Sequence, residues 1–128
     1  MKISVPISVG ELFDKISILE IKKIKIKDKT KLQDINFELN ALKQICAKKR
    51  LNKKNNKEQY IKLLNINKRL WNIEDKKRSY EKSKKFDKAF IELARKVYLL
   101  NDRRAKIKNK INHISGSMIR EVKSYEKY

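Results

Sequence analysis

Charged and polar side chains interrupt the apolar stripes of this chain with helical spacing. One row contains Asn101, Arg104 and Lys108, and a second row runs through Trp71 and Glu74. A half-buried charge needs a partner, because removing it from water is costly. Near the N-terminus two further charges of opposite sign lie one helical turn apart. The candidate ligand-binding residues are therefore Glu11, Lys15, Trp71, Glu74, Arg78, Asn101, Arg104 and Lys108.

The sequence leaves three interpretations of these residues open. In the first, they form salt bridges between helices that fix the register, with Glu74 or Asp75 near Arg103 or Arg104. In the second, they line a basic polar pocket between helices. There the cations that bind an anion would be Lys15, Arg78, Arg104 and Lys108, and the carboxylate that orients it would be Glu11 or Glu74. In the third, they are solvated surface.

Residues that carry catalysis or hold a metal are scarce. Gly10 and Gly116 stand alone, so there is no glycine-rich phosphate loop. His113 has no second histidine or cysteine beside it, which argues against a zinc or haem site. We therefore expect no catalytic residue, no metal and no cofactor. An enzyme that works by positioning and charge stabilisation alone remains an alternative.

The net charge of +20 would attract polyanions, of which nucleic acid is the usual one. However, 28 of the 35 basic residues are lysine, and isoleucine and asparagine are also abundant. All three have A/T-rich codons, so genome composition explains much of the excess. Arginine, the better recognition residue, occurs only seven times. Non-specific binding of nucleic acid is therefore the minority hypothesis.

Length and composition place the chain among small helical proteins. A chain of 128 residues suits one domain, and two glycines and one proline are too few for the turns of an all-β fold. There is no apolar run long enough for a membrane span or a signal peptide. Cys46, the only cysteine, lies on an apolar stripe and is expected in the core. A single thiol suits a reducing compartment, so we expect a cytoplasmic protein.

Four helices are expected after an extended segment of residues 1–7. The first begins at Ser8, which with Glu11 can form a capping box. The second is capped by Asp28 or Thr30 and carries a coiled-coil-like seam. Residues 52–56 contain no apolar side chain and are expected to form a loop. The third helix should span about 57–82 and the fourth 86–114, with Gly116 as its C-cap and residues 117–128 as a tail.

The helix lengths predict the architecture. A helix of thirty residues spans about 45 Å, which exceeds the width of a compact domain of this size. The last two helices should therefore form a long antiparallel hairpin, with the first two packed against part of it. We expect a single domain over residues 1–128 with an all-α, four-helix antiparallel bundle-like fold. The uncovered apolar strip predicts a homodimer, with Trp71 and the fourth helix near the contact.

Four segments carry a resemblance to a known family. They are residues 6–22 (PISVGELFDKISILEIK), 70–75 (LWNIED), 90–98 with 101–105 (FIELARKVY, NDRRA), and 116–117 with 121–125 (GS, EVKSY). Over nearly its whole length the chain resembles an uncharacterised family of short bacterial and phage proteins, a domain of unknown function. The resemblance implies that certain residues belong to the family pattern: Glu11, Asp14, Lys15, Trp71, Glu74, Asp75, Arg95, Tyr98, Asn101, Asp102, Arg104, Lys123, Ser124 and Tyr125.

A second resemblance covers one helix. Residues 11–16 (ELFDKI) are similar to the first helix of the all-helical chorismate mutases, with Lys15 in place of an arginine. That likeness implies a dicarboxylate bound between helices. From the residues themselves we expect a helical binding or interaction protein that takes an acidic small molecule or an acidic partner segment. The alternatives are a small helical enzyme acting on an anionic metabolite and a non-specific nucleic-acid-binding protein.

Overall fold

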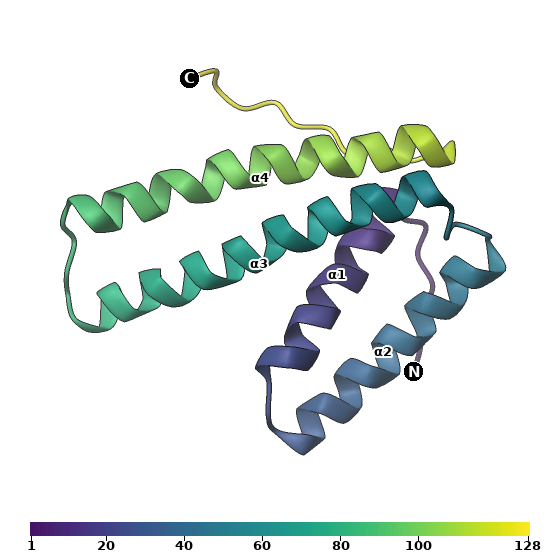
Figure 1. Ribbon diagram of the computed structural model, residues 1–128, viewed down its shortest axis with the longest axis horizontal. Coiled ribbons are helices and arrows are strands. Elements are labelled where there is room, and N and C mark those ends of the chain that lie inside the picture. Colours follow the sequence, from purple (N-terminus) through teal and green to yellow (C-terminus); the bar gives the residue numbers. More distant parts are fainter.

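The computed structural model describes residues 1–128 and contains four helices and no strand. The helices are α1 (Val9–Lys25), α2 (Lys29–Lys48), α3 (Lys54–Lys82) and α4 (Lys88–Ser115) (Figure 1). The predicted all-α class and the number of helices are confirmed. None of the four helices has both the length and the apolar character that crossing a membrane requires.

The helices form two antiparallel hairpins. α3 and α4 lie side by side along their length, and α1 and α2 form a shorter hairpin inclined steeply to them (Figure 1). α1 packs against all three other helices. It reaches the half of the α3–α4 hairpin that holds the start of α3 and the end of α4. The other half projects beyond α1 and α2, as the helix lengths predicted.

The helix ends follow their capping residues. Ser8 Oγ accepts a hydrogen bond from Glu11 N at 3.0 Å, and Asp28 Oδ1 accepts one from Lys31 N at 2.9 Å. Gly116 ends α4 with φ of 64°, a left-handed conformation that favours glycine. The predicted capping box forms only in part: Ser8 caps the helix, but the Glu11 carboxylate pairs with Lys108. Asp87, which falls inside the range 86–114 predicted for the last helix, is the N-cap residue of α4.

The loop predicted over residues 52–56 is present only at residues 52–53, and its extension over residues 54–56 was wrong, since α3 already begins at Lys54. Asn56 is buried; its Nδ2 donates to Leu51 O at 2.9 Å, and Ser115 Oγ donates to its Oδ1 at 3.2 Å. The asparagine side chain thus joins the start of α3 to the end of α4. Tertiary hydrogen bonds therefore outweigh the local preference of a polar run for a loop.

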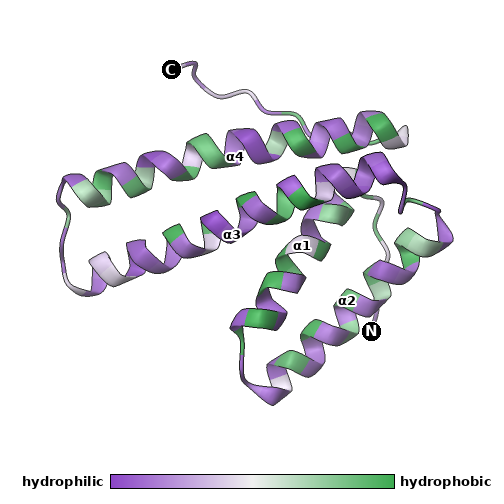
Figure 2. Cartoon of the chain, viewed as in Figure 1, coloured by the Kyte–Doolittle hydropathy of each residue, from purple (hydrophilic) through white to green (hydrophobic).

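The core has two parts. The larger joins residues of all four helices: Leu12, Phe13, Ile16, Leu19, Ile35, Leu39, Cys46, Leu63 and Ile111. The smaller, Leu70, Ile73 and Leu100, lies between α3 and α4. Figure 2 shows α1 as a largely apolar helix between more hydrophilic neighbours. The core position of Cys46 is confirmed, because this residue is only 2% exposed.

Gly10 allows α1 to begin directly against α4. A Cβ atom at this position would lie 2.4 Å from the backbone oxygen of Lys108 and 2.9 Å from Asn112 Oδ1. Both distances are shorter than ordinary van der Waals contact, so a side chain here would push the two helices apart. This close approach brings the charged residues of α1 within reach of those on α4.

Candidate functional site

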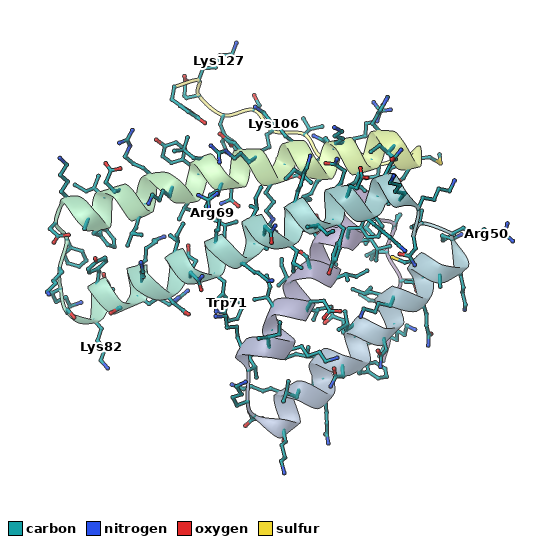
Figure 3. All side chains as sticks on the ribbon, viewed as in Figure 1. Arg50, Arg69, Trp71, Lys82, Lys106 and Lys127 are labelled. Atoms are coloured by element: carbon teal, nitrogen blue, oxygen red, sulfur yellow. The ribbon has the colours of Figure 1, made fainter.

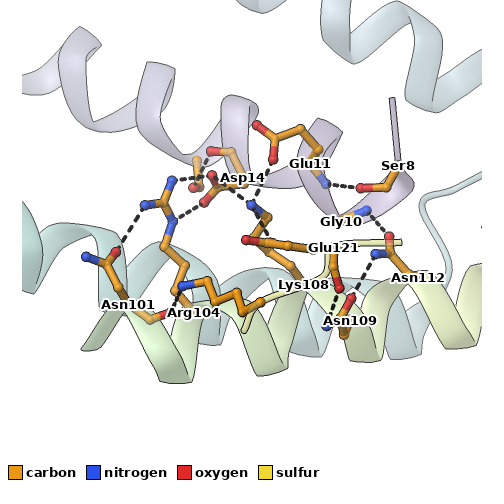
Figure 4. A network of polar contacts seen from close by, with 12 residues as sticks. Ser8, Gly10, Glu11, Asp14, Asn101, Arg104, Lys108, Asn109, Asn112 and Glu121 are labelled. Atoms are coloured by element: carbon orange, nitrogen blue, oxygen red, sulfur yellow. Dashed lines mark hydrogen bonds and ion pairs between the residues drawn. The ribbon is translucent and has the colours of Figure 1, made fainter. Parts of the chain in front are cut away.

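A buried carboxylate on α1 is the centre of a polar network (Figure 4). Asp14 is 1% exposed. Its Oδ1 accepts from Arg104 Nε at 2.9 Å and from Asn67 Nδ2 at 2.9 Å, while Arg104 Nη2 donates to its Oδ2. The bidentate contact with Asp14 raises the pKa of Arg104, despite the opposing effect of burial. The Asp14 side chain therefore ties α1 to both α3, through Asn67, and α4, through Arg104.

Lys108 is the second buried charge of the network, 6% exposed. Its Nζ lies 2.8 Å from Glu11 Oε2, 2.8 Å from Glu121 Oε2 and 3.9 Å from Asp14 Oδ2. Burial lowers the pKa of Lys108, but the hydrogen bonds with Glu11 and Glu121 outweigh this and leave it raised. Three carboxylates thus surround two cations, so this buried cluster carries no excess positive charge.

The N-terminus of α1 is closed by its own chain. Val9 N donates to Ser117 Oγ at 3.2 Å, and Gly10 N donates to Asn112 Oδ1 at 2.6 Å. Glu11 N donates to Ser8 Oγ, as described above. Because the free N–H groups of the first turn are occupied, this helix end is not an open anion site.

A cleft of about 380 Å³ lies on the other side of Asp14. It opens in the angle between α1 and the projecting half of α3, where Figure 3 shows Trp71. Its lining residues are Ile18, Ile21, Asn67, Leu70, Trp71, Glu74, Asp75, Arg78 and Arg104. The volume lies within the range of small-molecule sites in proteins.

The charges in the cleft are balanced but not all paired. Glu74 Oε1 forms an ion pair with Lys77 Nζ at 3.2 Å. Asp75 and Arg78 are exposed and take part in no ion pair. Arg104 uses three of its five N–H groups on Asp14 and, through Nη1 at 3.3 Å, on Asn101 Oδ1. Two N–H groups of Arg104 therefore remain for a ligand.

The predicted site residues fall into three groups. Trp71, Glu74, Arg78 and Arg104 line the cleft, and Asn101 supports Arg104. Glu11 and Lys108 belong to the buried network beside the C-terminal segment. Lys15 is exposed, outside the cleft lining and without an ion pair. Glu74 and Arg104, predicted to approach each other, line the same cleft but form no ion pair, because the Arg104 guanidinium pairs with Asp14.

Asp14 and Asn67 are the central residues that sequence reasoning left out of the site. A signal for Asp14 was present, since Gly10, Asp14, Ser17 and Ile21 recur at helical spacing and are all buried. A carboxylate on such a buried row needs a cation. The sequence could not say which of the 35 basic residues supplies it.

No three His, Cys, Asp or Glu side chains come together in a way that could hold a metal ion.

Ion pairs involve six of the 35 basic residues, namely Lys43, Lys77, Lys84, Arg95, Arg104 and Lys108. Most of the positive charge is thus free at the surface.

Comparison with known proteins identifies a family without a known activity. No curated protein and no solved structure matches this chain. The model of a family of unknown function, DUF6165, matches residues 1–128. The chain therefore belongs to the family of unknown function DUF6165.

Proposed function

We propose that this protein is a binding module whose cleft between α1 and α3 takes a small amphipathic acid. The observation that carries the proposal is the meeting of an apolar wall with two guanidinium groups in one cleft. Trp71, Leu70 and the isoleucines of α1 form the wall, and Arg78 and Arg104 supply the cations. A few polar groups beside apolar surface are typical of small-molecule sites.

Arg104 is held in place before any ligand arrives. Asp14 contacts two of its nitrogens and Asn101 a third, so its orientation costs a ligand little entropy. Asp14 neutralises most of its charge, which leaves Arg104 as a directional donor. Arg78, exposed and without an ion pair, would form the ion pair with the ligand's carboxylate.

The two acidic residues of the cleft restrict the ligand. Asp75 forms no ion pair, and Glu74 forms one with Lys77. A second carboxylate on the ligand would meet their negative charge. We therefore expect one carboxylate attached to a planar apolar body that packs against Trp71.

Trp71 is the only tryptophan of the chain and reports directly on the cleft. Phenylacetate should shift the indole N–H signal in a nuclear magnetic resonance titration, with a dissociation constant of roughly 1 mM for so small a ligand. Phenylacetamide, which lacks the charge, and benzene-1,4-dicarboxylate should bind at least about fivefold more weakly.

Arg78→Gln should weaken the binding of phenylacetate, because it removes the free cation of the cleft. Arg69→Gln is the matched control, since Arg69 is exposed and lies nine residues earlier, on the opposite face of α3. Equal binding of the acid and the amide, or equal loss in both variants, would contradict the proposal. Mass spectrometry of phenylacetate and related acids after incubation with the protein distinguishes a binding module from an enzyme. A binding module leaves the acid unchanged, whereas an enzyme converts it.

A second candidate is non-specific binding of nucleic acid, favoured by the many basic side chains outside ion pairs. Such binding should weaken steeply between 50 and 200 mM salt and show no sequence preference, because it depends on counterion release. A gel-shift assay with labelled single- and double-stranded DNA at low salt tests it. The absence of any shift would remove this candidate.

A further inference from the structure

A second hollow, of about 220 Å³, opens where α1 diverges from α3 (Figure 1). Its lining residues are Ile21, Ile24 and Lys25 of α1 and Lys68 and Asn72 of α3. Their spacing of three or four positions puts the residues of each helix on one face, so the two helices form facing walls. Ile21 is the only one of them that also lines the cleft beside Trp71. The hollow is therefore a neighbouring but distinct place at the crossing of α1 and α3.

The lining of this hollow is cationic. Lys25 and Lys68 are exposed, and neither takes part in an ion pair. Asn72 is also exposed and adds an amide that can donate hydrogen bonds. No carboxylate lines the hollow. The charge that a ligand meets here is thus that of two ammonium groups, unlike the balanced charge of the cleft.

The end of α1 does not cancel this positive charge. The last carbonyl groups of a helix carry roughly half a negative charge. Here Ile26 N donates to Lys22 O at 2.8 Å, and Lys27 Nζ donates to Ile24 O at 3.1 Å. Two of these carbonyl groups are therefore occupied, and Lys27 brings a third ammonium group beside a lining residue.

The carboxylates next to this end of α1 are bound elsewhere. Glu20 pairs with Lys43, and Asp28 Oδ1 accepts from Lys31 N at 2.9 Å. A phosphate monoester carries about −1.5 to −2 charges at neutral pH and offers three strong acceptor oxygens. Two free ammonium groups and one amide match that charge and that number of acceptors.

We infer that this hollow binds the phosphate group of a small phosphate monoester. Lys25 and Lys68 pair with its charged oxygens, and Asn72 Nδ2 donates to the third. Ile21 and Ile24 contact the first carbon atoms of the ester. The volume is below that of sites for drug-sized ligands, so the hollow holds the phosphate and few atoms more. The inference does not depend on the function proposed for the cleft beside Trp71.

The probe is glycerol 3-phosphate, titrated into the full-length protein and followed by the Asn72 side-chain amide signals in nuclear magnetic resonance spectra. We expect a dissociation constant of roughly 1 mM, as for other ligands of this size. Dimethyl phosphate, a diester with a single charge, should bind at least about fivefold more weakly, because it forms fewer charge-assisted hydrogen bonds.

The variant with both Lys25→Gln and Lys68→Gln should bind glycerol 3-phosphate about tenfold more weakly. The matched control carries Lys23→Gln and Lys62→Gln, which remove the same charge from the same two helices. Both control residues are exposed, lie outside the hollow and form no ion pair, so the control should stay within about twofold of the unchanged protein. Equal losses in the two double variants would overturn the inference, because binding would then follow net charge alone.

Two further results would also overturn it. A loss in Arg78→Gln as large as in the Lys25 and Lys68 variant would place the phosphate in the cleft beside Trp71. Tighter binding of dimethyl phosphate than of glycerol 3-phosphate would assign the hollow to the diester backbone of nucleic acid.

Vesicles identify the source of the phosphate monoester. Phosphatidic acid carries such a group at a membrane surface, so vesicles of phosphatidylcholine with a minor share of phosphatidic acid are sedimented with the protein. Co-sedimentation that is lost in the Lys25 and Lys68 variant, but kept in the matched control, supports the site with a lipid headgroup as its ligand. Binding of glycerol 3-phosphate without co-sedimentation supports it with a free ester.

Discussion

Replacing Asp14 by asparagine tests whether the buried network holds the fold together. The variant has nearly the same volume but loses the negative charge opposite Arg104 and Lys108. Its side-chain amide also directs an N–H donor at an Arg104 nitrogen that now donates a hydrogen bond to Asp14. Removing one partner of a buried ion pair costs about 3–5 kcal/mol, because the remaining charge is left uncompensated.

The structure places the expected loss at the lower end of that range. The Arg104 side chain is 26% exposed, so water can partly solvate its guanidinium once the carboxylate is gone. The asparagine oxygen can still accept from Asn67, as Asp14 Oδ1 does. We therefore expect a loss of about 3 kcal/mol in the free energy of unfolding, which for a chain of this length lowers the melting temperature by roughly 10 °C.

Urea unfolding followed by circular dichroism at 222 nm measures this loss. Asp75→Asn is the matched control, because Asp75 is exposed and without an ion pair, and it should stay within about 0.5 kcal/mol of the unchanged protein. A double-mutant cycle with Arg104→Gln should give a coupling energy of about 2 kcal/mol. A loss under about 1 kcal/mol for Asp14→Asn, with no coupling, would refute the account of the network given above.

Gly10→Ala should destabilise the protein by roughly 3 kcal/mol, because its Cβ meets the backbone of α4. Gly116→Ala should cost only about 1 kcal/mol, since this residue faces open space and the cost comes from its φ of 64°. Urea unfolding of both variants measures the two losses. Burial, reinforced by nearby negative charge, raises the pKa of Tyr60 from 10.0 to about 12, so the tyrosine ionises first in the unfolded chain. Between pH 9 and 11 the unchanged protein should therefore lose about 1 kcal/mol more stability than Tyr60→Phe. Phe86, just before α4, and Ile91, near its start, are 53% and 54% exposed and favour self-association. Light scattering should give twice the monomer mass of 15.3 kDa, and a stable monomer at high micromolar concentration would contradict the homodimer.

Local sequence determined the helices and most of their ends. Side chains such as Ser8 and Asp28 bind the first free N–H groups of their own helix, and Gly116 adopts the left-handed conformation that ends one. These interactions span a few residues and need no partner from elsewhere in the chain. The long hairpin followed as well, because the lengths of α3 and α4 exceed what a compact domain can enclose.

Tertiary structure alone decided which polar residues work together. Asn56 looked like part of a loop until its hydrogen bond with Ser115 placed it inside. The sequence offered many cations for Asp14, and the close approach of α1 and α4 at Gly10 selected Arg104. Periodicity reports which face of a helix is buried, but a charge pair depends on the register and crossing of two helices far apart in the chain. That is why the stripes could be read from the sequence while the network around Asp14 and the register of residues 117–128 on α4 could not.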